Sequence, residues 1–280
     1  MTAFREVSDR VWVARHTWFD LNIAVIAGTE GLLVVDTHAS ASAARAVLEQ
    51  VRTLSPLPVA AVVNTHEHFD HTFGNGVIGA GVPVYAHETA AANTVPAGER
   101  AKRAYAAEPE DPHAGEVAET EIVPADRTFS SAVSLDLGER PVELVHPGLG
   151  HTAGDVVVRV PDADVLLAGD LVEESATPGF GPDCHPMEWP LTLDLVSALL
   201  TEDSVVVPGH GAVVDRDFAL EQRAAIGGVA ETIRDLAGRG VPVDAALASA
   251  EWPFPVEDLA DAVRRGYQAL PRSARSLPLL

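Results

Sequence analysis

An uncharged, mostly apolar run at residues 58–64 ends abruptly in a histidine-rich segment. Such a run is typical of a strand that is buried on both faces of a sheet. Residues 31–36, earlier in the chain, are also apolar, and residues 40–54 carry apolar side chains at helical spacing behind a serine at the N-cap position. A buried strand with helical neighbours predicts a sheet that helices cover.

The rest of the chain continues this alternation of short strands and helices. We predict further strands at residues 10–16, 22–28, 82–86, 131–137, 142–146, 155–160, 165–168 and 204–208. We predict helices at 191–200 and over most of 215–270, helix mixed with irregular connection at 88–127, and a Pro/Gly-rich loop at 171–190. With no internal repeat and no clear linker, the interpretation is one α/β domain over residues 1–280, mostly helical from 215 to 280.

Composition excludes several classes of protein. Hydrophobic residues make up 47% of the chain and charged residues 21%, which provides enough apolar surface for a folded core. A net charge of −22 argues against nucleic acid as a partner, because that affinity comes mostly from Lys and Arg on phosphates. No apolar run approaches the roughly 18 residues of a membrane span, and charges interrupt the N-terminal segment. We therefore expect a soluble cytoplasmic protein that acts on a small molecule and has no membrane partner.

The histidine-rich segment after the buried strand concentrates residues that can bind a metal. His66 and His68 are two apart and project to one side of an extended loop, while Asp70 and His71 follow as the chain turns into a helix. Imidazole together with carboxylate is the ligand set expected of zinc or iron. Three further metal-capable residues lie at the ends of later predicted strands, beside small residues that allow close backbone approach: His151, Asp170 and His210.

This ligand set predicts hydrolysis without a serine or cysteine nucleophile. Two divalent metals about 3.5 to 4 Å apart can share a water, lower its pKa toward roughly 7, and polarise a substrate carbonyl. Asp70 can bind metal and also hydrogen-bond the hydroxide, so we assign it the catalytic role of orienting the attack and passing the proton to the leaving group. In the 171–190 loop, His185 and Trp189 are candidate substrate contacts, although Trp189 could equally anchor the following helix in the core.

With these residues the sequence resembles the metallo-β-lactamase superfamily of αββα-sandwich hydrolases, in which two mixed sheets are flanked by helices. The match runs from about Val11 to Gly211 and includes the HxHxDH signature. Carried over by position, the resemblance implies a first metal on His66, His68 and His151, a second metal on Asp70, His71 and His210, and Asp170 as the bridge between them. It also implies that Asp36 orients the ligand loop without binding a metal itself, and that the cofactor is two Zn²⁺, with Fe or Mn as alternatives.

Departures from particular branches of the superfamily narrow the function. Zinc β-lactamases usually carry Cys or Ser at the position of Asp170. An aspartate at this position is typical of glyoxalase II-like thioesterases and lactonases. No tyrosine lies in the 171–190 loop, unlike in standard homoserine lactonases. The leading hypothesis is a dinuclear zinc hydrolase of a small ester, lactone, thioester or amide. The alternatives are a mononuclear iron persulfide dioxygenase that uses His66, His151 and Asp170, a true zinc β-lactamase, and a binding protein without turnover.

Overall fold

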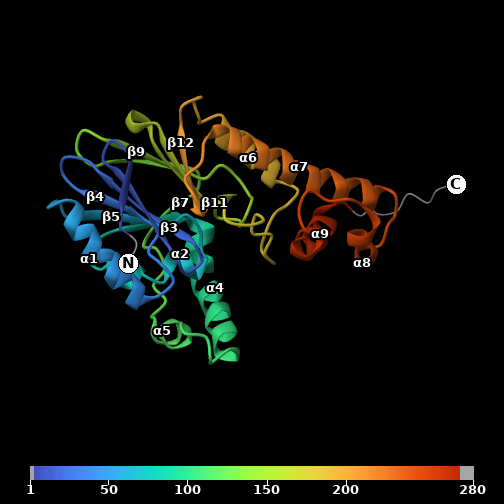
Figure 1. Ribbon diagram of the computed structural model, residues 1–280, viewed down its shortest axis with the longest axis horizontal. Coiled ribbons are helices and arrows are strands. Elements are labelled where there is room, and N and C mark those ends of the chain that lie inside the picture. The colour runs from blue at the N-terminus through green and yellow to red at the C-terminus, as the bar shows by residue number, and fades with distance from the viewer. Residues whose placement is uncertain (1–2, 272–280) are drawn as a thin grey trace.

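The computed structural model describes residues 3–271, which form two mixed sheets packed face to face with helices on their outer sides (Figure 1). In the first sheet, neighbouring strands are antiparallel as far as β4 and parallel beyond it. Its strands, in spatial order, are β1 Arg5–Ser8, β2 Val11–His16, β3 Leu21–Ala27, β4 Leu32–Val35, β5 Val59–Val63, β6 Val84–His87 and β7 Arg127–Phe129.

The second sheet begins beside the end of β3. Its strands, in spatial order, are β12 Val205–His210, β11 Val165–Glu173, β10 Val157–Val160, β9 Pro141–Val145 and β8 Ala132–Asp136. The β11 and β12 strands are parallel, and the others are antiparallel. Within the described residues, the two sheets join through one residue pair, His210 with Leu21. This junction brings the end of β12 to the edge where β3 begins.

Helices cover the outer faces of both sheets, as the sequence predicts. On the side of the first sheet lie α1 Ala41–Leu54, α2 Phe69–Thr72, α3 Asn75–Ile78, α4 Glu88–Ala107 and α5 Ala114–Glu119. On the side of the second lie α6 Trp189–Ser197, α7 Arg216–Gly238, α8 Val243–Ala246 and α9 Ala260–Ala269. Short 3₁₀ turns occupy Pro161–Ala163, Leu247–Ser249 and Val256–Asp258. The αββα sandwich is thereby confirmed, with α1 and α7 on opposite sides of the sheets (Figure 1).

The apolar run at residues 58–64 forms β5, and its side chains alternate between two hydrophobic clusters. Val63 packs in the cluster between the sheets, together with Leu144 of β9. Val62 points the other way and packs in the cluster against α1, which contributes Val47. Because both faces of β5 are covered at residues 61–63, that part of the strand needs no polar residue before the sheet edge, whereas Ala60 is exposed. A further cluster between the second sheet and α6–α9 buries Leu166.

Several boundaries differ from the sequence prediction. The β1 strand was not predicted, since charged and polar residues make up much of Arg5–Ser8. The predicted strand at 165–168 continues to Glu173, because Leu171 and the residue after it are fully buried and shifts in register let β11 follow β12 past Gly169. The loop predicted at 171–190 is therefore shorter, residues 174–188, and α6 begins at Trp189 rather than at residue 191.

The described part of the chain ends inside the predicted range. Residues 1–2 and 272–280, which the prediction of one domain over 1–280 included, lie outside the described residues. The predicted helical tail agrees with α7, whose N-cap Asp215 accepts a hydrogen bond from the backbone of Phe218 at 2.9 Å. None of the helices within residues 3–271 combines the length and the apolar character that crossing a bilayer requires.

Candidate metal centre

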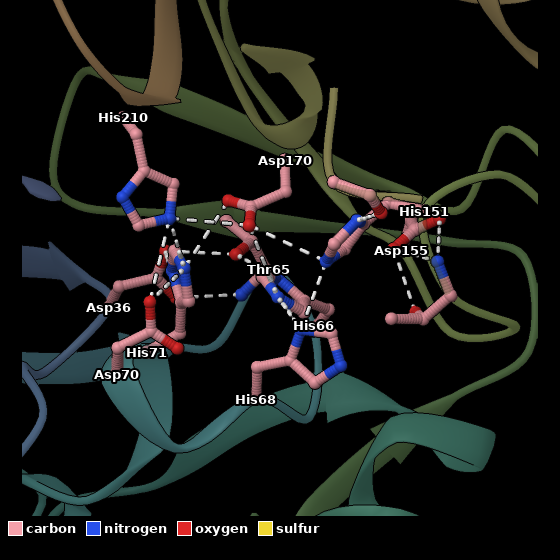
Figure 2. A network of polar contacts seen from close by, with 12 residues as sticks. Asp36, Thr65, His66, His68, Asp70, His71, His151, Asp155, Asp170 and His210 are labelled. Carbon is pink, nitrogen blue, oxygen red and sulfur yellow. Dashed lines mark hydrogen bonds and ion pairs between the residues drawn. The ribbon is translucent and has the colours of Figure 1, made fainter. Parts of the chain in front are cut away.

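The predicted ligands follow β5 and β9, lie inside β11 and end β12, and they meet at one edge of the sandwich. Asp170 was predicted at the end of its strand, but it lies within β11 because that strand continues to Glu173. Figure 2 shows their side chains pointing toward Asp170 of β11. One group, called here the first half, consists of His66, His68 and His151 around this carboxylate. His68 Nδ1 lies 3.0 Å from His66 Nε2 and 2.9 Å from His151 Nε2. Asp170 Oδ2 is 3.7 Å from His66 Nε2 and 3.4 Å from His151 Nε2, so four ligand atoms surround one small volume.

The other group, called here the second half, consists of Asp70, His71 and His210. His71 Nε2 and His210 Nε2 are 3.3 Å apart, and Asp70 Oδ2 lies 3.5 Å from each of them. Asp170 also reaches this group, with Oδ1 at 3.2 Å from His71 Nε2 and Oδ2 at 3.3 Å from His210 Nε2. The Asp170 carboxylate therefore stands between the two halves, where a bridging ligand belongs.

The chemistry of the donor set fits cations. The outer nitrogens of two imidazoles face carbonyl oxygens: His151 Nδ1 is 2.9 Å from the Gly179 oxygen, and His210 Nδ1 is 2.7 Å from the Phe19 oxygen. Because a carbonyl only accepts hydrogen bonds, these nitrogens carry the hydrogen and the inner nitrogens present lone pairs. Lone pairs that face one another at about 3 Å, beside a buried Asp170 Oδ1 without a hydrogen-bond partner, need a positive charge between them.

The two halves differ in their electrostatics. Burial lowers the pKa of His66 well below its ordinary value and lowers that of His151 to about 4. Burial also opposes the charged form of His210, but the carboxylates of Asp170 and Asp70 outweigh it and raise the pKa of His210 to about 10. Negative charge is thus concentrated on the second half, where the protein supplies a carboxylate in addition to the shared one.

Asp36, directly after β4, holds the ligand loop from behind. Its Oδ1 accepts the Thr65 backbone N–H at 2.8 Å, and its Oδ2 accepts the Thr65 hydroxyl at 2.8 Å. The same Oδ2 lies 2.8 Å from His71 Nδ1, so the carboxylate fixes the ring with Nε2 toward the centre. Close approach at the centre also depends on Gly209, because a Cβ there would lie 1.9 Å from Asp170 Oδ1.

The comparisons with known proteins identify a family. The family model described as "Metallo-beta-lactamase superfamily" matches residues 16–210. The chain belongs to this superfamily. A "Metallo-beta-lactamase type 2" from Bacillus cereus is 28% identical over 201 residues, which cover 71% of this chain and 70% of that protein.

Two further relatives extend the comparison. A "Linear primary-alkylsulfatase" from a Pseudomonas species is 26% identical and covers 90% of this chain, which spans 54% of that protein. Among solved structures, a metallo-beta-lactamase from Pontibacter korlensis superposes with a TM-score of 0.65 at 25% identity, covering 81% of this chain and 99% of that one. The superposition shows that this chain shares its fold with that metallo-beta-lactamase.

Asp36→Ala is expected to lower metal affinity and turnover by about 10- to 100-fold, the usual cost of losing a partner that orients a ligand. His71 would keep its position in the chain but lose the carboxylate that fixes its ring. Equilibrium metal titration and initial rates measure the effect. Asp235→Ala, which breaks an exposed ion pair on α7, should leave both unchanged. Wild-type affinity in the Asp36 variant would contradict the assignment.

The two candidate substrate contacts both pack beside the segment that carries His151. Trp189 has no exposed surface; its indole N–H donates to the Leu171 oxygen at 3.3 Å, and its ring centre is 5.9 Å from that of His151. This placement favours the alternative that Trp189 anchors α6 in the core. His185 is half-buried and donates its backbone N–H to the Gly150 oxygen at 2.8 Å. Burial, with the charge of Arg265, lowers the pKa of His185.

Sequence reasoning missed two sets of residues beside the centre. Asp183, in the loop before α6, lies 3.2 Å from His68 Nε2. Aromatic side chains line the other side: Phe19 in the turn before β3 packs edge-on against Phe69 of α2 at 5.6 Å, and Phe69 packs against Tyr105 of α4 at 5.8 Å. The only sequence signal for Asp183 is that its loop follows Asp170. The aromatic residues are scattered along the chain and show no local pattern.

Proposed function

We propose that this protein is a metal-dependent hydrolase with a dinuclear centre, and that the two ions are zinc, with iron or manganese as alternatives. The observation that carries the proposal is the convergence of two ligand groups on one shared carboxylate, Asp170. The proposed ligands are His66, His68 and His151 for one ion, Asp70, His71 and His210 for the other, and Asp170 for both.

Two such ions, when bound, supply a hydroxide at neutral pH and a Lewis acid for the substrate carbonyl. The chain's own residues fix the geometry of that reaction. Asp170 lies between the two halves, and the imidazoles of His66, His71, His151 and His210 around it are buried. The Asp70 side chain is 12% exposed. One of its carboxylate oxygens can bind the metal ion, and the other can accept the proton of the attacking water and pass it to the leaving group.

The surroundings of the centre favour a small substrate with an apolar part. Phe19 is 43% exposed beside the second half, and Phe69 and Tyr105 continue the apolar surface. The net charge of −22 argues against nucleic acid. We propose a small ester, lactone, thioester or amide as the substrate. The names of the relatives add a β-lactam and an alkyl sulfate to the compounds worth testing.

Metal analysis followed by a hydrolysis panel tests the proposal. Protein purified without added metal and then supplied with zinc is expected to bind about two ions per chain. A chelator should abolish hydrolysis of at least one compound among an ester, a lactone, a thioester, a β-lactam and an alkyl sulfate, and zinc should restore it. One tightly held iron, with no second ion after zinc supplementation and no hydrolysis, would instead favour the mononuclear dioxygenase that uses His66, His151 and Asp170.

A further inference from the structure

The loop of residues 174–188, between β11 and α6, reaches the first half of the centre through one carboxylate. Asp183 Oδ2 lies 3.2 Å from His68 Nε2 and 3.1 Å from a guanidinium nitrogen of Arg100 on α4. The opposite nitrogen of the same ring, His68 Nδ1, is the atom that faces the other imidazoles of the first half. Asp183 therefore contacts His68 on the side away from the centre.

Asp183 contacts a ligand imidazole of the first half in the way that Asp36 contacts one of the second half. Among the described residues, each half contains one imidazole backed by a carboxylate: His71 by Asp36 at 2.8 Å and His68 by Asp183 at 3.2 Å. The outer nitrogens of the remaining imidazoles face neutral partners, namely the Thr65 hydroxyl and the carbonyls of Gly179 and Phe19. A carboxylate behind a ligand imidazole fixes the ring's tautomer and raises its basicity.

We propose that Asp183 is a positioning residue for the metal of the first half. It holds the hydrogen of His68 on Nε2, so that the Nδ1 lone pair points to the centre, and Arg100 holds Asp183 in place. The inference rests on the proposed function, because it assumes that the first half binds a cation.

This role makes the first half dependent on the loop. Residues 174–188 supply Asp183 behind His68 and the Gly179 carbonyl behind His151, and so they support two of its three imidazoles. The second half is supported from elsewhere, by Asp36 at the end of β4 and by the Phe19 carbonyl in the turn before β3. A change in the loop should therefore weaken one metal and spare the other.

A mere surface ion pair is the competing interpretation, since the side chains of Arg100 and Asp183 are 49% and 27% exposed and exposed pairs contribute little. Asp183→Asn distinguishes the two. The amide keeps the shape of the side chain but removes its negative charge. The amide oxygen is a weaker acceptor for His68 and Arg100 than a carboxylate oxygen, and the amide nitrogen in its place would donate to His68 Nε2 and favour the tautomer with its hydrogen on the wrong nitrogen. The expected result is a loss of about 10- to 100-fold in the affinity of one zinc ion, with the other unchanged.

Competition with a chromophoric chelator measures both zinc affinities, and ¹⁵N NMR of the histidine side chains in the zinc-loaded protein reports the tautomer of His68. Asp194→Asn is the matched control, because it breaks a carboxylate–guanidinium pair on α6 and α7 with Arg223. It should leave both affinities at the wild-type value. Two wild-type zinc affinities and an unchanged His68 tautomer in the Asp183 variant would overturn the inference while leaving the proposed function intact.

Arg100→Gln provides a second variant on an exposed helix, for the case in which Asp183→Asn does not fold. It should weaken the same zinc ion by about 2- to 5-fold, because it only loosens Asp183. Wild-type affinities in that variant, with the Asp183 variant unfolded, would overturn the inference. A wild-type protein that binds no metal at all would overturn the proposed function, and the inference with it.

Discussion

Asp170→Ala is expected to lose both metal ions and to lower kcat/KM by well over the roughly 100-fold that removal of an orienting partner costs. The reason is that one carboxylate lies within 3.7 Å of four imidazole nitrogens and is shared by the two halves. Without it, the first half would bind a cation through its three imidazoles alone, and the second half would keep only the Asp70 carboxylate to neutralise the charge. Elemental analysis and initial rates on the best substrate of the panel measure the outcome.

Gly209→Ala tests the same point without removing the carboxylate. Its new methyl group would lie 1.9 Å from Asp170 Oδ1 and must displace it, so both metal content and rate should fall. Gly115→Ala is a suitable control, because a Cβ there meets nothing within 4 Å. If Asp170→Ala retained two zinc ions and a rate near that of the wild type, the bridging role would be wrong.

Trp189→Ala is expected to lower the free energy of unfolding by about 3–5 kcal/mol, the usual cost of removing a fully buried large aromatic side chain. Trp189 has no exposed surface. Its ring centre lies 5.2 Å from that of Phe180 and 5.9 Å from that of His151. Urea denaturation measures the change. Leu191→Ala, two residues along the same helix and 67% exposed, should change stability by no more than about 0.5 kcal/mol.

The outcome also decides between the two interpretations of Trp189 that the sequence left open. An anchor of α6 predicts a less stable protein in which every substrate is affected by a similar factor. A substrate contact predicts wild-type stability with kcat/KM altered unequally across an ester, a lactone and a β-lactam. The second result would show that the fully buried position of Trp189 changes when substrate binds.

Features that depend on near neighbours in the chain could be predicted from the sequence. The Ser40 side chain caps α1 by accepting the Ala43 N–H at 3.0 Å, and helical spacing then places Val47 and Val51 in the core. The uncharged run at 58–64 gave β5 its buried position. The candidate ligands could also be predicted, because the HxHxDH segment is local and the later ligands lie near the ends of predicted strands. Strand ends that point the same way meet at one edge of a sheet.

Features that depend on contacts between distant residues could be seen only in the folded protein. His68 and Asp183 are 115 positions apart, and no local spacing relates them. The extension of β11 to Glu173 required β12 as its partner, and the burial of Trp189 required the core beneath α6. Periodicity and helix caps act within a few residues. The residue that contacts the outer nitrogen of a ligand imidazole is determined by how the sheets and helices pack. The contact between Asp183 and His68 could therefore be found only in the structure.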